Sequence, residues 1–212
     1  MLKRLLLLCT LALFAATASA TTILTFGQVG NDSPISATNN GLGSTTITGT
    51  DVAVTITQID AAVLTPISAF LNLSATSIGA ASLNSGNVVQ PYSGTFSITS
   101  GAGGTGTNYL SGTFSDSVFG AQGGSSLVLS VANPPESVTF TSGVIAATEL
   151  GLPLGMSLSF ANVNPPVGIT AGSLSSFSGS VSGTFSAVPA PEPASMLLLG
   201  CGLLGIALRR RK

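Results

Sequence analysis

The sequence contains no histidine and no tryptophan, and its two cysteines and six basic residues all lie near one end of the chain or the other. The basic residues are Lys3, Arg4, Arg209, Arg210, Arg211 and Lys212. The long central part, residues 21–188, therefore has no cation at all. Its charged residues are the acids Asp32, Asp51, Asp60, Asp116, Glu136 and Glu149. The overall net charge of −1 hides a central part with a net charge of −6.

These absences exclude several classes of function for the central part. Nucleic-acid binding relies on Lys and Arg to neutralise phosphates, so we expect no nucleic-acid partner. Ser-His-Asp and Cys-His catalysis, and zinc sites built from His and Cys, lack their essential side chains. The two cysteines, Cys9 and Cys201, lie in the apolar segments at the two ends, so no disulfide is available to the central part. We expect no cofactor and no metal.

The six carboxylates are the charged side chains of the central part that could take part in catalysis or metal binding. A pair of them could serve glycoside hydrolysis, but no motif surrounds them and no Trp or Arg is present to hold a sugar ring. Calcium takes oxygen ligands, and Asp51 and Asp60 flank one predicted strand, but neither this stretch nor Asn31-Asp32 has ligands at alternating positions. We therefore expect solvated loop acids and no enzyme.

The central part alternates between apolar and polar residues with a period of two. In residues 92–99, Tyr92, Phe96 and Ile98 share one face and Ser and Thr side chains share the other. Val, Ile, Thr and Phe favour strands, and the Gly, Asn and Pro clusters between these segments favour turns. Similar alternation recurs in residues 52–57, 67–73, 127–131, 138–140 and 158–160. We therefore predict an all-β domain over residues 21–188.

One apolar face on each of about eight to ten strands fits two antiparallel sheets packed face to face. The predicted fold is accordingly an antiparallel β-sandwich. Closure of the sheet into a barrel is the competing arrangement. The outer-membrane kind would need strands of about ten residues and girdles of aromatic side chains, for which two tyrosines and no tryptophan are too few.

The sequence Ser-Gly-Thr-Phe-Ser occurs three times, at residues 93–97, 111–115 and 182–186. The spacings between the copies fit no fixed repeat unit, so equivalent strands of one domain explain them better than a solenoid. Each copy should place its Phe on the face opposite the Thr and Ser side chains. The last copy runs directly into Val188, where we expect the domain to end.

The first 20 residues have the organisation of a signal peptide. A basic pair at residues 3–4 precedes an apolar run over residues 5–14, and Ala18 and Ala20 occupy the small-residue positions of an A-x-A cleavage site. We predict export through the Sec machinery and a mature chain that begins at Thr21.

Residues 189–212 combine a proline-flanked acid, an apolar run and a basic end. The motif is Pro191, Glu192 and Pro193, the uncharged run covers residues 194–208, and the tail is Arg209, Arg210, Arg211 and Lys212. The prolines disfavour helix at the motif, which should be extended and accessible. A helix over the apolar run would span roughly 22 Å, short of the ~30 Å hydrocarbon core. The basic tail should stay in the cytoplasm, so we predict a hydrophobic C-terminal helix that is a marginal membrane anchor.

This order of motif, apolar run and basic tail resembles the PEP-CTERM sorting signal of bacterial exosortase substrates. The resemblance implies that an exosortase processes the chain at Pro191, Glu192 and Pro193. It also implies a transient inner-membrane intermediate that is passed to the cell surface or the extracellular matrix. A permanent membrane anchor after a proline-rich linker is the alternative.

With so few charges, the surface of the domain should be rich in Ser, Thr, Asn and Gly. Such groups bond to water, to sugars or to each other, and uncharged strand edges pair readily with neighbours. We hypothesise a structural matrix protein that self-associates or embeds in the exopolysaccharide of a biofilm. A carbohydrate-binding, lectin-like module is the other hypothesis, and it would need an exposed aromatic side chain. Tyr92 alternates with core residues and should be buried, which leaves Tyr109 as the candidate glycan contact.

Overall fold

The computed structural model describes residues 20–30, 35–60, 62–131 and 136–189. The predicted sorting motif, hydrophobic helix and basic tail, and the signal peptide up to residue 19, lie outside these residues. The described strands are β1 (Thr21–Gln28), β2 (Ile35–Asn39), β3 (Thr45–Ile59), β4 (Ala62–Ser77), β5 (Ser82–Asn84), β6 (Asn87–Gly101), β7 (Thr105–Ala121), β8 (Leu127–Val131), β9 (Ser137–Val138), β10 (Gly151–Asn164), β11 (Ile169–Thr170), β12 (Ser173–Leu174) and β13 (Phe177–Val188). The 3-10 turns η1 (Ala102–Gly104) and η2 (Ala147–Glu149) are the remaining elements.

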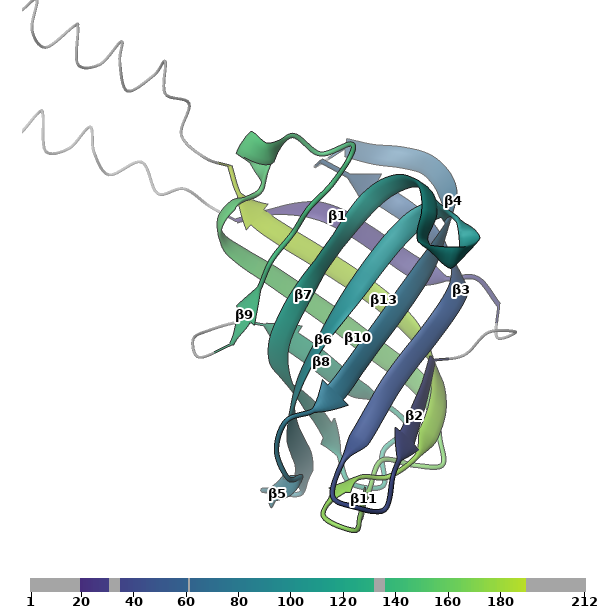
Figure 1. Cartoon of the computed structure of the whole chain (residues 1–212), viewed down its shortest axis with the longest axis vertical. Coiled ribbons are helices and arrows are strands. Elements are labelled where there is room, and N and C mark those ends of the chain that lie inside the picture. Colours follow the sequence, from purple (N-terminus) through teal and green to yellow (C-terminus); the bar gives the residue numbers. More distant parts are fainter. Residues whose placement is uncertain (1–19, 31–34, 61, 132–135, 190–212) are drawn as a thin grey trace, which may run out of the picture.

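The long strands form one antiparallel sheet that closes on itself (Figure 1). The order around the sheet is β6-β4-β3-β1-β13-β10-β8-β7, and β7 pairs with β6 to complete the ring. The short strands β2, β5 and β9 attach to this ring, and β11 and β12 form a separate hairpin. The fold is therefore an eight-stranded antiparallel β-barrel.

The prediction of an all-β domain is confirmed, but the predicted β-sandwich is wrong. Alternation reveals which face of a strand is buried, and a sandwich and a barrel both bury one face, so the pattern cannot separate them. Strand pairing distinguishes a barrel from a sandwich. Here β6 pairs with β4 on one side and with β7 on the other, and β8 pairs with both β7 and β10. Two stacked sheets would have left these edges unpaired.

Aromatic rings from separate parts of the chain pack together inside the barrel. The Phe96 and Phe185 rings stack with their centroids 4.9 Å apart, and the Phe26 and Phe185 rings stack at 6.2 Å. Phe140 packs edge-on against Phe96 and Phe185, at 6.1 and 5.6 Å. Each such pair contributes about 0.5–1.5 kcal/mol beyond the burial of its surface.

The repeated Ser-Gly-Thr-Phe-Ser sequence builds this interior. The copies in β6 and β7 pair antiparallel with each other, so that Gly94 lies opposite Phe114 and Gly112 lies opposite Phe96. The Phe side chains of all three copies are buried, as predicted, and the Thr side chains are exposed. A Cβ atom at Gly112 would come within 3.2 Å of the Phe96 ring, whereas a Cβ atom at Gly94 would meet the backbone of Ser74 and Ala75 in β4. Both glycines therefore permit the close approach of a neighbouring segment.

One end of the barrel is covered by the β11–β12 hairpin (Figure 1). Gln90 lies in the interior and holds this hairpin with its side-chain amide. Its Nε2 donates to Ser173 Oγ at 2.7 Å and to the Gly79 carbonyl at 2.9 Å, while its Oε1 accepts from the Leu174 backbone N–H at 2.8 Å. The Tyr92 hydroxyl donates to the same Oε1 at 3.1 Å. Because buried polar groups are costly unless paired, this network fixes the hairpin in place.

Candidate functional site

The two ends of the domain lie together at the other end of the barrel (Figure 1). Thr21 begins β1 and pairs with Ala187 of β13, and Val188 at the end of β13 pairs with Gly151. Ala20, the predicted last residue of the signal peptide, is exposed directly before β1. Both predicted processing sites therefore flank the same end of the barrel.

Almost no linker separates the barrel from the sorting motif. Ala187 and Val188 are buried and hydrogen-bonded within the sheet, and Pro191 follows Val188 by three residues. Three extended residues span about 10 Å. Any enzyme that acts at the motif must therefore work close to the barrel surface.

A folded β domain is thus followed within a few residues by the C-terminal segment. Residues 189–212 match the family model of the PEP-CTERM protein-sorting motif, which confirms the resemblance stated above. The motif indicates an exported protein that an exosortase processes. No curated protein and no solved structure matches the chain.

The predicted membrane segment, residues 194–208, lies outside the described part of the chain. Among the described residues, no helix is long and apolar enough to cross a membrane. The transient membrane stage therefore rests on the sorting motif, which indicates membrane anchoring before delivery.

The outward side chains of the barrel form cross-strand rows of hydroxyl groups, as the composition predicted. Two of these rows, which we call the hydroxyl face, cross β2, β3, β4, β6 and β7 and end on β9 or the residue after it. The first row is Ser36, Thr48, Ser74, Thr95, Thr113 and Thr139, and the second is Thr38, Thr46, Thr76, Ser93, Ser115 and Ser137. Neighbouring strands are about 4.8 Å apart, so the hydroxyls are regularly spaced.

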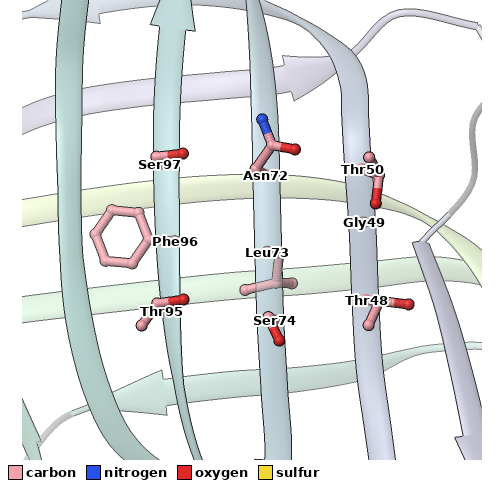
Figure 2. A pocket seen from close by; sticks show the side chains of 9 residues that line it. All are labelled: Thr48, Gly49, Thr50, Asn72, Leu73, Ser74, Thr95, Phe96 and Ser97. Atoms are coloured by element: carbon pink, nitrogen blue, oxygen red, sulfur yellow. The ribbon is translucent and has the colours of Figure 1, made fainter. Parts of the chain in front are cut away.

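Some hydroxyls of this face bond to each other across strands. Ser36 and Thr48 are joined at 3.2 Å, and Thr113 and Thr139 at 2.8 Å. The centre of the face has a shallow, open depression of about 450 Å³ (Figure 2). Its lining, which contains no charged side chain, is Thr48, Gly49, Thr50, Asn72, Leu73, Ser74, Thr95, Phe96 and Ser97. The face can therefore exchange hydrogen bonds with neutral groups, and its depression has no charged side chain to pair with an ion.

The two tyrosines differ in their surroundings. Tyr92 is fully buried, as predicted, and burial raises the pKa of its hydroxyl well above the ordinary value, although a hydrogen bond with Thr45 lowers it. Tyr109 is only partly exposed and packs against the core, so little of its ring is free. Glycan contact by Tyr109 stays a prediction.

Sequence reasoning missed Phe119, which is 52% exposed. Within the described residues it is the one exposed aromatic side chain. The signal was present in the alternation, because Phe114, Asp116 and Val118 point inward along β7 and therefore place residue 119 on the outer face.

The acids do not all lie in solvated loops as expected. Asp116 points into the barrel and is 2% exposed, and burial raises the pKa of its carboxyl from 3.8 to about 7. The Ser117 backbone N–H lowers this pKa, whereas the adjacent Glu136 carboxyl raises it further. Asp116 is therefore closed off from solvent, whereas Glu136 is half-buried.

Asp51 has a structural role at a bulge in β3. Its Oδ1 accepts from the Gly103 backbone N–H at 2.6 Å and from Asn72 Nδ2 at 3.0 Å, which ties the η1 turn to the sheet. Asp60 is exposed on the turn between β3 and β4. Over the described ranges, no three acids, histidines or cysteines come together as a metal site would require.

Proposed function

We propose that this protein is a structural component of the cell surface or extracellular matrix, delivered by an exosortase, whose barrel embeds in exopolysaccharide. The observation that carries the proposal is a barrel with an uncharged hydroxyl face that is followed within a few residues by a PEP-CTERM sorting motif. The basic tail stays in the cytoplasm while the motif is processed, and the barrel is then released outside.

Embedding in a polysaccharide suits this barrel better than self-association by strand pairing. Ring closure pairs both edges of each long strand, and the short strands β5 and β9 end the sheet path. Because exposed edges are the usual route to strand addition, closure removes most of that route. The hydroxyl face remains as the surface through which the barrel would interact.

A structural role without catalysis is part of the proposal. The central part has no His, Cys, Lys or Arg, and its Asp116 and Glu136 carboxyls meet where Asp116 is shut inside the barrel. The hydroxyl face supplies hydrogen bonds but no base strong enough to activate one of its own Ser or Thr residues.

The test compares cells that make exopolysaccharide with cells in which its synthesis is deleted. We expect the processed protein to stay with the matrix in the first strain and to be released into the medium in the second. A Glu192→Ala variant, which should remain in the inner membrane of both strains, controls for failed sorting. Retention of processed wild-type protein by the cells without exopolysaccharide would contradict the matrix role.

A further inference from the structure

One outward row of the barrel is apolar. Phe119 of β7 lies between Val89 of β6 and Val128 of β8 in the sheet register. These strands lie side by side in the ring (Figure 1). Phe119 is 52% exposed and the two valines are half-buried, so an accessible aromatic side chain lies between two aliphatic ones. Directly opposite residues in a sheet are about 5 Å apart, which makes the three side chains one continuous patch.

Hydroxyl groups surround this apolar row. Toward the centre of β7 the next outward residues are Ser117, Ser115 and Thr113, the last two of which belong to the hydroxyl face. In the other direction Ser159 of β10 lies opposite Val128, and Ser182 of β13 lies opposite Ser159. Successive outward residues on a strand are about 6.6 Å apart. The apolar row is therefore followed by hydroxyl side chains both along β7 and across the sheet on β10 and β13.

We propose that the row of Val89, Phe119 and Val128, together with Ser117, Ser115 and Thr113, binds a neutral polysaccharide chain. A pyranose ring has an apolar face of C–H groups and a rim of hydroxyls. The C–H face would stack on Phe119, and hydroxyls of adjoining sugar units would bond to the serine and threonine side chains of β7. The inference rests on the proposed matrix function and names the surface that would perform it.

Charge selects the class of polymer. The central part carries six carboxylates and no cation, so a polyanionic polysaccharide would be repelled rather than held. The carboxyl nearest in sequence, Asp116, points into the barrel and leaves the outer face of β7 neutral. Hydroxyl-bearing uncharged sugars are the polymers that match both the apolar row and its surroundings.

The test is affinity gel electrophoresis of the processed protein recovered from producing cells, in gels that contain dextran, hydroxyethylcellulose or alginate. We expect retardation by at least one neutral polymer, none by alginate, and no loss of retardation when NaCl is added. Phe119→Ala should weaken binding to the neutral polymer about tenfold, whereas Phe119→Trp should preserve it. Leu42→Ala, at an 89% exposed apolar residue in the β2–β3 turn, is the matched control and should bind as wild type.

Each contrary result overturns the inference. Unchanged binding by Phe119→Ala, preference for alginate, or no retardation of wild-type protein by either neutral polymer would do so. Dissociation of a wild-type dimer in the Phe119→Ala variant, measured by analytical ultracentrifugation, would assign the row to a second copy of the chain instead. Thermal unfolding of each variant checks that the barrel is intact. These assays use already exported protein, so failed sorting would be detected separately by cell fractionation.

Discussion

Gly112 of β7 lies directly opposite Phe96 of β6, and a Cβ atom at residue 112 would come within 3.2 Å of the Phe96 ring. The same Cβ would also overlap the backbone carbonyl of Thr139, the residue that follows β9. Both residues come from copies of one five-residue sequence, and the reciprocal pair is Gly94 opposite Phe114. A Cβ atom at Gly94 would instead meet the β4 backbone at Ser74 and Ala75, so the glycine of each of these two copies allows a neighbouring segment to approach closely.

Replacement of this glycine should destabilise the barrel. We expect Gly112→Ala to lower the free energy of unfolding by about 1–3 kcal/mol, because backbone rather than a movable side chain occupies the space. Urea denaturation measures the change. Gly27→Ala is the control, since Gly27 also lies in a strand but has no atom near its added Cβ, and it should change stability little. Equal effects of the two substitutions would contradict this account of the repeat.

The buried Asp116 carboxyl should make the barrel less stable as the pH rises. Its pKa in the folded protein is raised from 3.8 to about 7, so the folded state binds the proton more tightly than the unfolded state. The resulting stabilisation is complete below about pH 4 and is lost as the pH rises to about 7. We expect the free energy of unfolding to fall on the order of 3 kcal/mol across this range.

Urea denaturation at a series of pH values measures this dependence, and Asp116→Asn should remove most of it because an amide does not titrate there. Asp60→Asn, at an exposed turn, serves as the control and should leave the fall in place. A stability that rises between pH 4 and 7 in the wild type, or a fall that survives Asp116→Asn, would refute the role of this carboxyl.

The Gln90 amide should hold the hairpin at the closed end of the barrel. Gln90→Met keeps most of the side-chain volume but removes four hydrogen bonds, and it leaves the Leu174 N–H and the Tyr92 hydroxyl without this acceptor. We expect a loss of about 2–4 kcal/mol in stability. Amide hydrogen exchange should quicken most at Ser173 and Leu174. Gln122→Met, at an exposed residue, should do neither, and uniform acceleration over the barrel would argue against a local role.

Alternation predicted much of the fold because the inward and outward faces differ sharply in polarity. Tyr92, Phe96 and Ile98 are buried as the pattern required, and β13, the last strand of the described residues, ends at Val188. Closure of the sheet could not be predicted, since it depends on which strands pair rather than on which residues are apolar. The glycines opposite Phe96 and Phe114 mark the close strand approach, but their partners become known only from the register.

The candidate sites likewise divide into features that a linear sequence shows and features that depend on strand pairing. The sorting motif at Pro191, Glu192 and Pro193 is a linear signal and could be recognised from sequence. The hydroxyl face was foreseen as a composition, but its rows depend on the register of six strands. Phe119 was overlooked because it directly follows another apolar residue, Val118, and only the alternation that begins at Phe114 places it on the outer face.

The central claim is that the chain is processed at both ends and released with its barrel intact. Intact mass of the native protein, combined with cell fractionation, tests this most directly. The account predicts a chain that begins at Thr21 and ends near Pro191, found at the surface or in the matrix. Cleavage before Val188 would remove the pair that this residue forms with Gly151 at the end of β13. Glu192→Ala should accumulate in the inner membrane with its tail attached. A native protein that keeps residues 209–212 and stays in the membrane would contradict the account.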